Sequence, residues 1–80
     1  MKIPRDISGQ RLISSLAKLG FQITRQRGSH IRLTTQISSE EYHISIPNHD
    51  PIKIGTLNNI LKDISEKLGI NKEDLIKKIF

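Results

Sequence analysis

Apolar residues recur along the chain at two different spacings, and each spacing predicts a different element. Residues three or four apart are apolar in 8–19, 56–68 and 71–79, which is the spacing of helices with one buried face. Apolar and polar residues alternate in 21–26, 30–34 and 42–46, which is typical of half-buried strands. The pattern therefore predicts a helix, three strands, a second helix and a short C-terminal helix.

Residues that favour helix ends stand at the borders of these segments. Ser8, Thr56 and Asn71 are suited to cap the three helices, because their side chains can accept hydrogen bonds from the first backbone amides. Gly20 and Gly69 are suited to end the first two helices in a left-handed conformation. We expect residues 1–6 to form an extended lead-in and residues 36–41 a polar loop.

Three consecutive strands with short connections favour an antiparallel sheet, because neighbouring strands usually pair. Two helices would then cover one face of this sheet and leave the other face open. The sequence thus predicts an α+β fold with α-β-β-β-α order and a short C-terminal helix. With 80 residues, the chain is long enough for one domain, which we expect to cover residues 1–80.

Strand alternation also predicts which side chains lie on the open face. That set is Gln22, Thr24, Gln26, His30, Arg32, Thr34, His43 and Ser45, and the set against the helices is Phe21, Ile23, Ile31, Leu33, Ile44 and Ile46. Because paired residues share a face, we expect a three-residue turn at 27–29 with Gln26 opposite His30. The second hairpin should pair Arg32 with Ser45 and Thr34 with His43. This register places His43 about 13 Å along the sheet from His30.

Charge is distributed unevenly along the chain, whose formal net charge is +5. Up to residue 35 there are seven Lys and Arg against one acid, and all five arginines precede residue 33. Arginine suits bidentate contact with phosphate, so this half favours a polyanionic partner, although a solvated basic face is the plainer alternative. The chain has no cysteine, no long apolar run and no export-type N-terminus, so we expect a cytoplasmic protein without disulfides.

The three histidines differ in their suitability for acid–base chemistry. His30 begins a strand beside a glycine turn and among arginines, so it is the best candidate for proton transfer, although an ordinary surface histidine is the alternative. His49 could assist or could simply pack in its loop, and His43 is better explained as an exposed strand residue. The histidines are too dispersed to indicate a metal site, and no motif indicates a cofactor.

Several short motifs, in order, resemble one known family. They are Gly20-Phe21, the run from Arg25 to His30 with its Gly-Ser-His end, Ile46-Pro-Asn-His49, Ile54-Gly-Thr-Leu57 and Ile60-Leu61. This set resembles the HicA toxins, the YcfA-like group of bacterial type II toxin–antitoxin systems, over about residues 8–80.

The resemblance implies a double-stranded-RNA-binding-like fold, cleavage of mRNA with His30 as the essential residue, and a HicB antitoxin that masks the site. We expect Arg25, Arg27, Ser29 and Arg32 to contact RNA, with His49 and Gln26 as accessory residues. The chain departs from its relatives in strand two, where Ile31 and Leu33 stand in place of a frequent aromatic residue.

Two other functions fit the same sequence. One is a non-catalytic double-stranded-RNA-binding module, but such modules often carry basic residues at the start of their last helix. Residues 55–61 contain none. The other is a protein-interaction domain whose charge only keeps it soluble.

Overall fold

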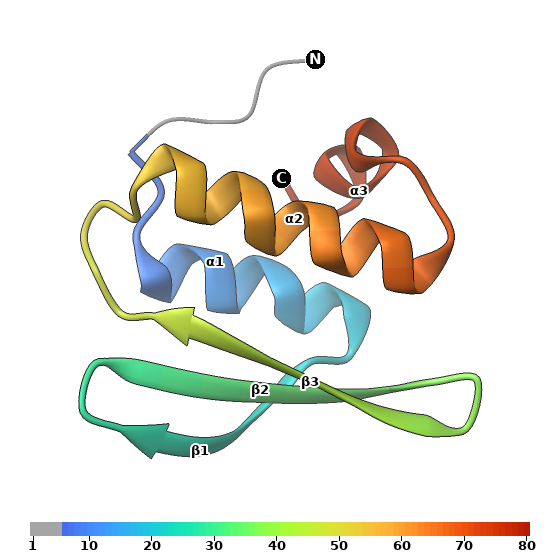
Figure 1. The fold of residues 1–80 in the computed structure, drawn as a ribbon, viewed down its shortest axis with the longest axis horizontal. Helices are drawn as coiled ribbons and strands as arrows, with labels where there is room; N and C mark the ends of the chain where they lie inside the picture. The colour runs from blue at the N-terminus through green and yellow to red at the C-terminus, as the bar shows by residue number, and fades with distance from the viewer. Residues whose placement is uncertain (1–5) are drawn as a thin grey trace.

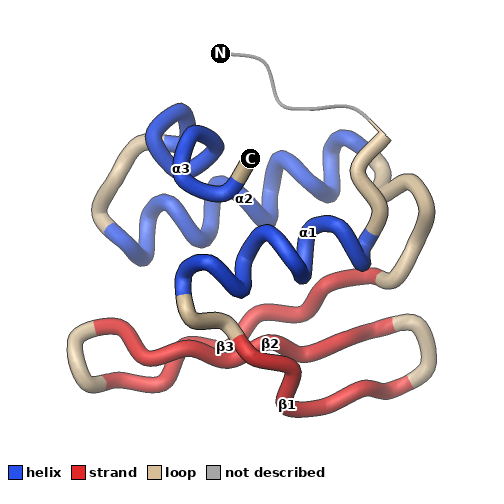
Figure 2. Tube along the Cα trace, turned by 180° about the vertical axis from the view of Figure 1, so that it is seen from behind, coloured by secondary structure: helices blue, strands red, loops and turns tan. Residues whose placement is uncertain are grey.

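The computed structural model describes residues 6–80, so most of the predicted lead-in lies outside the described residues. Its elements are α1 (Gly9–Leu16), the 3-10 turn η1 (Ala17–Leu19), β1 (Gln22–Arg27), β2 (His30–Ile37), β3 (Glu40–Pro47), α2 (Ile54–Leu68) and α3 (Lys72–Ile79). The strands form one antiparallel sheet in the order β1-β2-β3. The helices lie together on one side of this sheet (Figures 1 and 2). The predicted α+β fold and element order are confirmed.

The helix ends mostly follow the predicted capping residues. The Ser8 hydroxyl accepts a hydrogen bond from the Arg11 amide at 3.1 Å, and the Asn71 side chain accepts one from the Asp74 amide at 2.8 Å. Gly20 ends the first helical segment at φ 87°, a conformation that is costly for residues with a Cβ. The prediction of Thr56 as a cap is wrong, because α2 already begins at Ile54 and its N-cap position is Lys53, which makes no side-chain capping hydrogen bond.

One hydrophobic core joins the sheet to all three helices. Its fully buried members include Leu12 and Leu16 of α1, Leu33 and Ile46 of the sheet, Leu57, Leu61 and Ile64 of α2, and Leu75 and Ile79 of α3. Burial of each such side chain stabilises the fold by about 1.5–3 kcal/mol before entropy is counted. The Lys18 ammonium also donates to the Ile79 carbonyl at 3.1 Å, so α3 is fixed against the end of the first helical segment.

The first hairpin differs from its predicted register because β1 contains a bulge. Ile23 pairs with Leu33 and Arg25 with Arg32, so Thr24 is an extra residue on β1. After the bulge, Gln26 lies opposite Ile31 and Arg27 opposite His30, and the turn is the two residues Gly28-Ser29. The predicted pairing of Gln26 with His30 is therefore wrong. The bulge instead brings Arg25 and Arg27 to the face that carries His30.

Ile23 was also expected in the core, but its side chain is 56% exposed. It shares a face with its partner Leu33, which is fully buried. Since β1 is an edge strand, Ile23 lies at the margin of the sheet, where burial by the helices is incomplete.

The second hairpin has the predicted pairs and longer strands than predicted. His30 lies opposite Pro47, Arg32 opposite Ser45 and Thr34 opposite His43. The expected loop at 36–41 is instead paired strand on both sides of a two-residue turn, Ser38-Ser39. Both serines have positive φ, 53° and 68°, as a type I′ turn requires.

This turn offers a direct test of the hairpin. Asn-Gly is the favoured pair in type I′ turns, so the double change Ser38→Asn and Ser39→Gly should stabilise the fold by about 1 kcal/mol. We expect a rise in Tm of about 4–8 °C for a domain of this size, measured by thermal denaturation. Ser39→Ala, which keeps a Cβ at positive φ, should give no rise. An unchanged Tm in the Asn-Gly variant would contradict the turn geometry.

Candidate functional site

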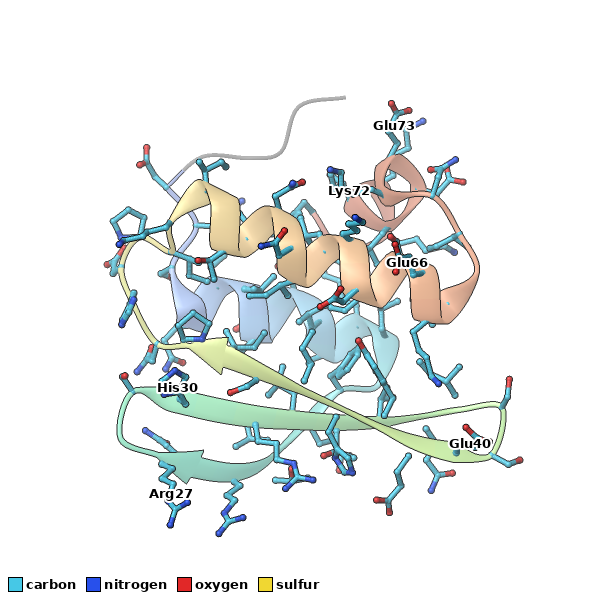
Figure 3. The ribbon with its side chains drawn as sticks, in the orientation of Figure 1. Arg27, His30, Glu40, Glu66, Lys72 and Glu73 are labelled. Carbon is cyan, nitrogen blue, oxygen red and sulfur yellow. The ribbon has the colours of Figure 1, made fainter. Side chains whose placement is uncertain are left out.

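The open face of the sheet carries a concentrated positive charge at one end. Arg25, Arg27, His30, Arg32 and Ser45 line a shallow hollow of about 200 Å³, here called the basic hollow. Figure 3 shows Arg27 and His30 at the same end of the sheet, on neighbouring strands. None of the five lining residues is acidic, so an anion that settles here meets three guanidinium groups without local competition.

Of the other two arginines in the N-terminal half, Arg5 lies outside the described residues and Arg11 lies away from the hollow. The Arg11 guanidinium is 5.8 Å from the centre of the Phe80 ring, on the helical side of the molecule. The distribution of arginines along the sequence therefore overstated the charge of a single face. Three arginines, brought together by the β1 bulge and the turn, form the described cluster.

His30 is the first residue of β2, and its orientation follows from its neighbours. Ile31 is only 2% exposed and packs into the core, so the adjacent His30 side chain must lie on the opposite face. His30 is exposed and stands between Arg27 on β1 and Pro47 on β3. It is therefore accessible to a large ligand and flanked by positive charge.

His30 also borders a second, larger depression, here called the His30 cleft, of about 400 Å³. Its strand side is formed by His30, Ser45 and Pro47. Its other side is formed by the loop after β3 and the first turns of α2, with His49, Ile52, Lys53, Thr56 and Ile60. The cleft thus brings His49 to the same depression as His30.

Backbone hydrogen bonds fix the loop that carries His49. The Asn48 amide donates to the Ser29 carbonyl at 2.6 Å, and the His49 carbonyl accepts from the Gly9 amide at 2.8 Å. Gly9 allows this close approach, since a Cβ there would lie 2.6 Å from the Pro47 carbonyl oxygen. The loop is therefore tied both to the β1–β2 turn and to the start of α1.

His43 occupies a different environment toward the other end of the open face. Its Nδ1 lies 2.7 Å from the Thr34 hydroxyl, which is itself 2.8 Å from the Thr24 hydroxyl. Its Nε2 lies 3.4 Å from a carboxylate oxygen of Glu41. The arginines do not surround His43, and its ring has structural partners, as expected for an exposed strand residue.

Tyr42, on the face of β3 opposite to His43, packs its ring edge-on against Phe21, with 6.2 Å between centroids. Burial, and next the nearby Asp63 carboxylate, raises the pKa of the Tyr42 phenol above its ordinary value of 10.0. Tyr42 is therefore neutral at physiological pH.

The predicted site residues fall into three groups. Arg25, Arg27, His30 and Arg32 lie together, and Ser29 adjoins them as an exposed residue of the turn. His49 lies across the His30 cleft. Gln26 is not brought to this site, because its pairing with Ile31 places it on the other face.

Lys53, Thr56 and Ile60 of the cleft were missed. The only signal that could have indicated them is the four-residue spacing of Thr56 and Ile60, which places them on one side of a helix.

Residues 6–80 contain neither a metal-binding cluster nor a membrane-spanning helix. No group of three His, Asp or Glu side chains in this range is arranged to hold a metal ion. None of the helices in this range has the length and apolar character needed to cross a membrane.

Comparison with known proteins adds the family. Residues 9–65 match the family model described as the HicA toxin of bacterial toxin–antitoxin systems. No curated protein and no solved structure gives a match. The matched region runs from the start of α1 into the last turns of α2, and so includes the basic hollow and the His30 cleft. The chain belongs to the HicA toxin family.

Proposed function

We propose that this toxin is an endoribonuclease that cuts mRNA, with His30 as its catalytic residue. The observation that carries the proposal is the position of His30, which is exposed between three arginines and a cleft that also holds a second histidine. An RNA target places the toxin's action in the cytoplasm. Membership of the HicA family supports the assignment as a toxin with an antitoxin partner. The residues of the site support the assignment of RNA cleavage.

The proposed reaction is a transesterification that uses the RNA's own 2′-hydroxyl. A base removes the 2′-hydroxyl proton, the 2′-oxygen attacks the adjacent phosphorus, and the bond from phosphorus to the 5′-oxygen breaks. An acid protonates the departing 5′-oxygen, so the products are a 2′,3′-cyclic phosphate and a 5′-hydroxyl. Imidazole can fill either role near neutral pH, and we assign one of them to His30.

His49 or a water molecule supplies the other proton transfer. His49 is exposed, and its loop is held by hydrogen bonds to the β1–β2 turn and to α1. Both histidines line the same cleft, so a phosphate at its mouth lies within the region that both can approach. This mechanism requires no metal ion or cofactor.

Arg25, Arg27 and Arg32 bind phosphates on both sides of the cleaved bond. Their guanidinium groups also stabilise the negative charge that grows on the phosphate oxygens during attack. Ser29 is exposed in the adjoining turn, and we assign its hydroxyl a hydrogen bond to a backbone phosphate. The arginines thus contribute most of the affinity for RNA, and His30 contributes most to the rate of cleavage.

A toxin with this exposed site needs a partner that covers it. We propose a HicB-type antitoxin that lays acidic or hydrogen-bonding side chains over the basic hollow, since complementary charge speeds association. Purified toxin should cut a labelled single-stranded RNA in the presence of EDTA, and the purified toxin–antitoxin complex should not. Co-expression should also restore growth. A stable complex that still cuts RNA would contradict the masking, and binding without cleavage would favour the non-catalytic RNA-binding module.

A further inference from the structure

The His30 cleft differs in chemistry from the basic hollow beside it. Ile52 and Ile60, which are 4% and 7% exposed, give it an apolar floor. The Ser45 and Thr56 hydroxyls and the Lys53 ammonium are at its walls, and none of these three side chains has a hydrogen-bond partner among residues 6–80. The cleft therefore combines an apolar surface with polar groups that are available to a ligand.

Size and lining together indicate the ligand class. At about 400 Å³ the cleft is near the lower end of the range for small-molecule sites, and too small for a base pair with its backbone. A free phosphate would gain little from the isoleucines. A nucleobase has apolar faces for such a floor and polar edges that hydroxyl and ammonium groups can bind.

Position relates the cleft to the proposed reaction. His30 and Ser45 line both depressions, so a strand that lies with its phosphates in the basic hollow must pass His30 to reach the cleft. Resting on the proposed function, we infer that the His30 cleft binds one unpaired base of the RNA, adjacent to the phosphate at His30. The polar edge of this base binds to the Thr56 and Ser45 hydroxyls and to the Lys53 ammonium. The substrate is therefore single-stranded at the cleaved bond, because a stacked, paired base cannot enter.

A binding experiment separates this inference from catalysis. The probes are fluorescent 2′-O-methyl decamers of adenine or uracil, which lack the attacking hydroxyl, and a 2′-O-methyl decamer of equal charge without bases. Thr56→Trp fills the cleft from an exposed helix position. Asn59→Trp is the matched control, because Asn59 is exposed on the same helix and does not line the cleft.

We expect the parent to bind at least one base-bearing decamer more tightly than the abasic decamer, and Thr56→Trp to reduce this preference about tenfold. Asn59→Trp should keep the preference, and a duplex of the same sequence should bind the parent and Thr56→Trp alike. Thr56→Met tests the same point if the indole prevents folding, which circular dichroism will report. If a folded Thr56 variant still prefers base-bearing decamers over the abasic decamer as strongly as the parent does, the inference is overturned. A lost preference in a protein that cuts no ordinary RNA would support the base site and refute the nuclease.

Discussion

Replacing Arg25, Arg27 and Arg32 together by alanine should weaken RNA binding about 1000-fold or more at low salt. Charge-assisted hydrogen bonds contribute about 1.5–3 kcal/mol each, and all three arginines line one hollow. Each phosphate contact on single-stranded RNA also contributes about 0.7 to the slope of log affinity against log salt, so the slope should fall by about 2. Fluorescence anisotropy across a salt titration measures both quantities.

A second triple variant controls for net charge. Lys62, Lys77 and Lys78 are exposed on α2 and α3, on the helical side of the molecule (Figure 1). Changing them to alanine removes the same number of positive charges and should alter affinity only slightly. Equal losses in the two triple variants would mean that overall charge, and not the basic hollow, governs binding.

His30→Ala should abolish RNA cleavage and toxicity while the fold survives. A group that transfers a proton contributes about 10²–10⁴-fold to the rate of cleavage. Because this nuclease is expected to be slow, loss of that factor should make cleavage undetectable. Because His30 is exposed, its removal creates no cavity, and the free energy of unfolding should change by no more than about 0.5 kcal/mol. RNA affinity should largely remain, since the arginines provide most of it.

His43→Ala is the matched control on the same face of the sheet. It removes the contacts with Thr34 and Glu41 but no group of the basic hollow, so cleavage should continue near the parental rate. If His30→Ala unfolds, its exposed position on β2 is wrong. If His43→Ala alone loses cleavage, the catalytic assignment belongs at the other end of the sheet.

The elements that could be predicted from the sequence are those with a clear apolar period or a capping residue. Ile31 and Leu33 on β2 and Ile44 and Ile46 on β3 alternate with polar residues, and this alternation determined the correct register of the second hairpin. Ser8 was predicted correctly as a helix cap from its local chemistry alone.

The first hairpin could not be predicted in the same way. After Ile23 every residue up to His30 is polar or glycine, so nothing in the pattern shows which face each side chain takes. The bulge at Thr24 lies where the pattern ends, and it decides that Arg25 and Arg27, not Gln26, join His30. Residues 36–41 are polar except for Ile37, so they also lack a clear alternation, and only cross-strand pairing shows that most of them are strand.

The His30 cleft depends on tertiary structure. Its walls come from the end of the sheet, the loop held by Gly9 and the first turns of α2, which are distant in sequence. Short motifs indicated His30 and His49, because the Gly-Ser-His and Pro-Asn-His runs are local. The helical wall of Lys53, Thr56 and Ile60 has no local pattern of this kind.

The proposal that His30 drives acid–base cleavage of RNA is tested most directly with a labelled DNA strand that contains a single ribonucleotide. The parent should cut this strand only after the ribose, and leave a 2′,3′-cyclic phosphate, while folded His30→Ala leaves it intact. Cleavage at a deoxyribose, or cleavage by folded His30→Ala at the parental rate, would contradict the account.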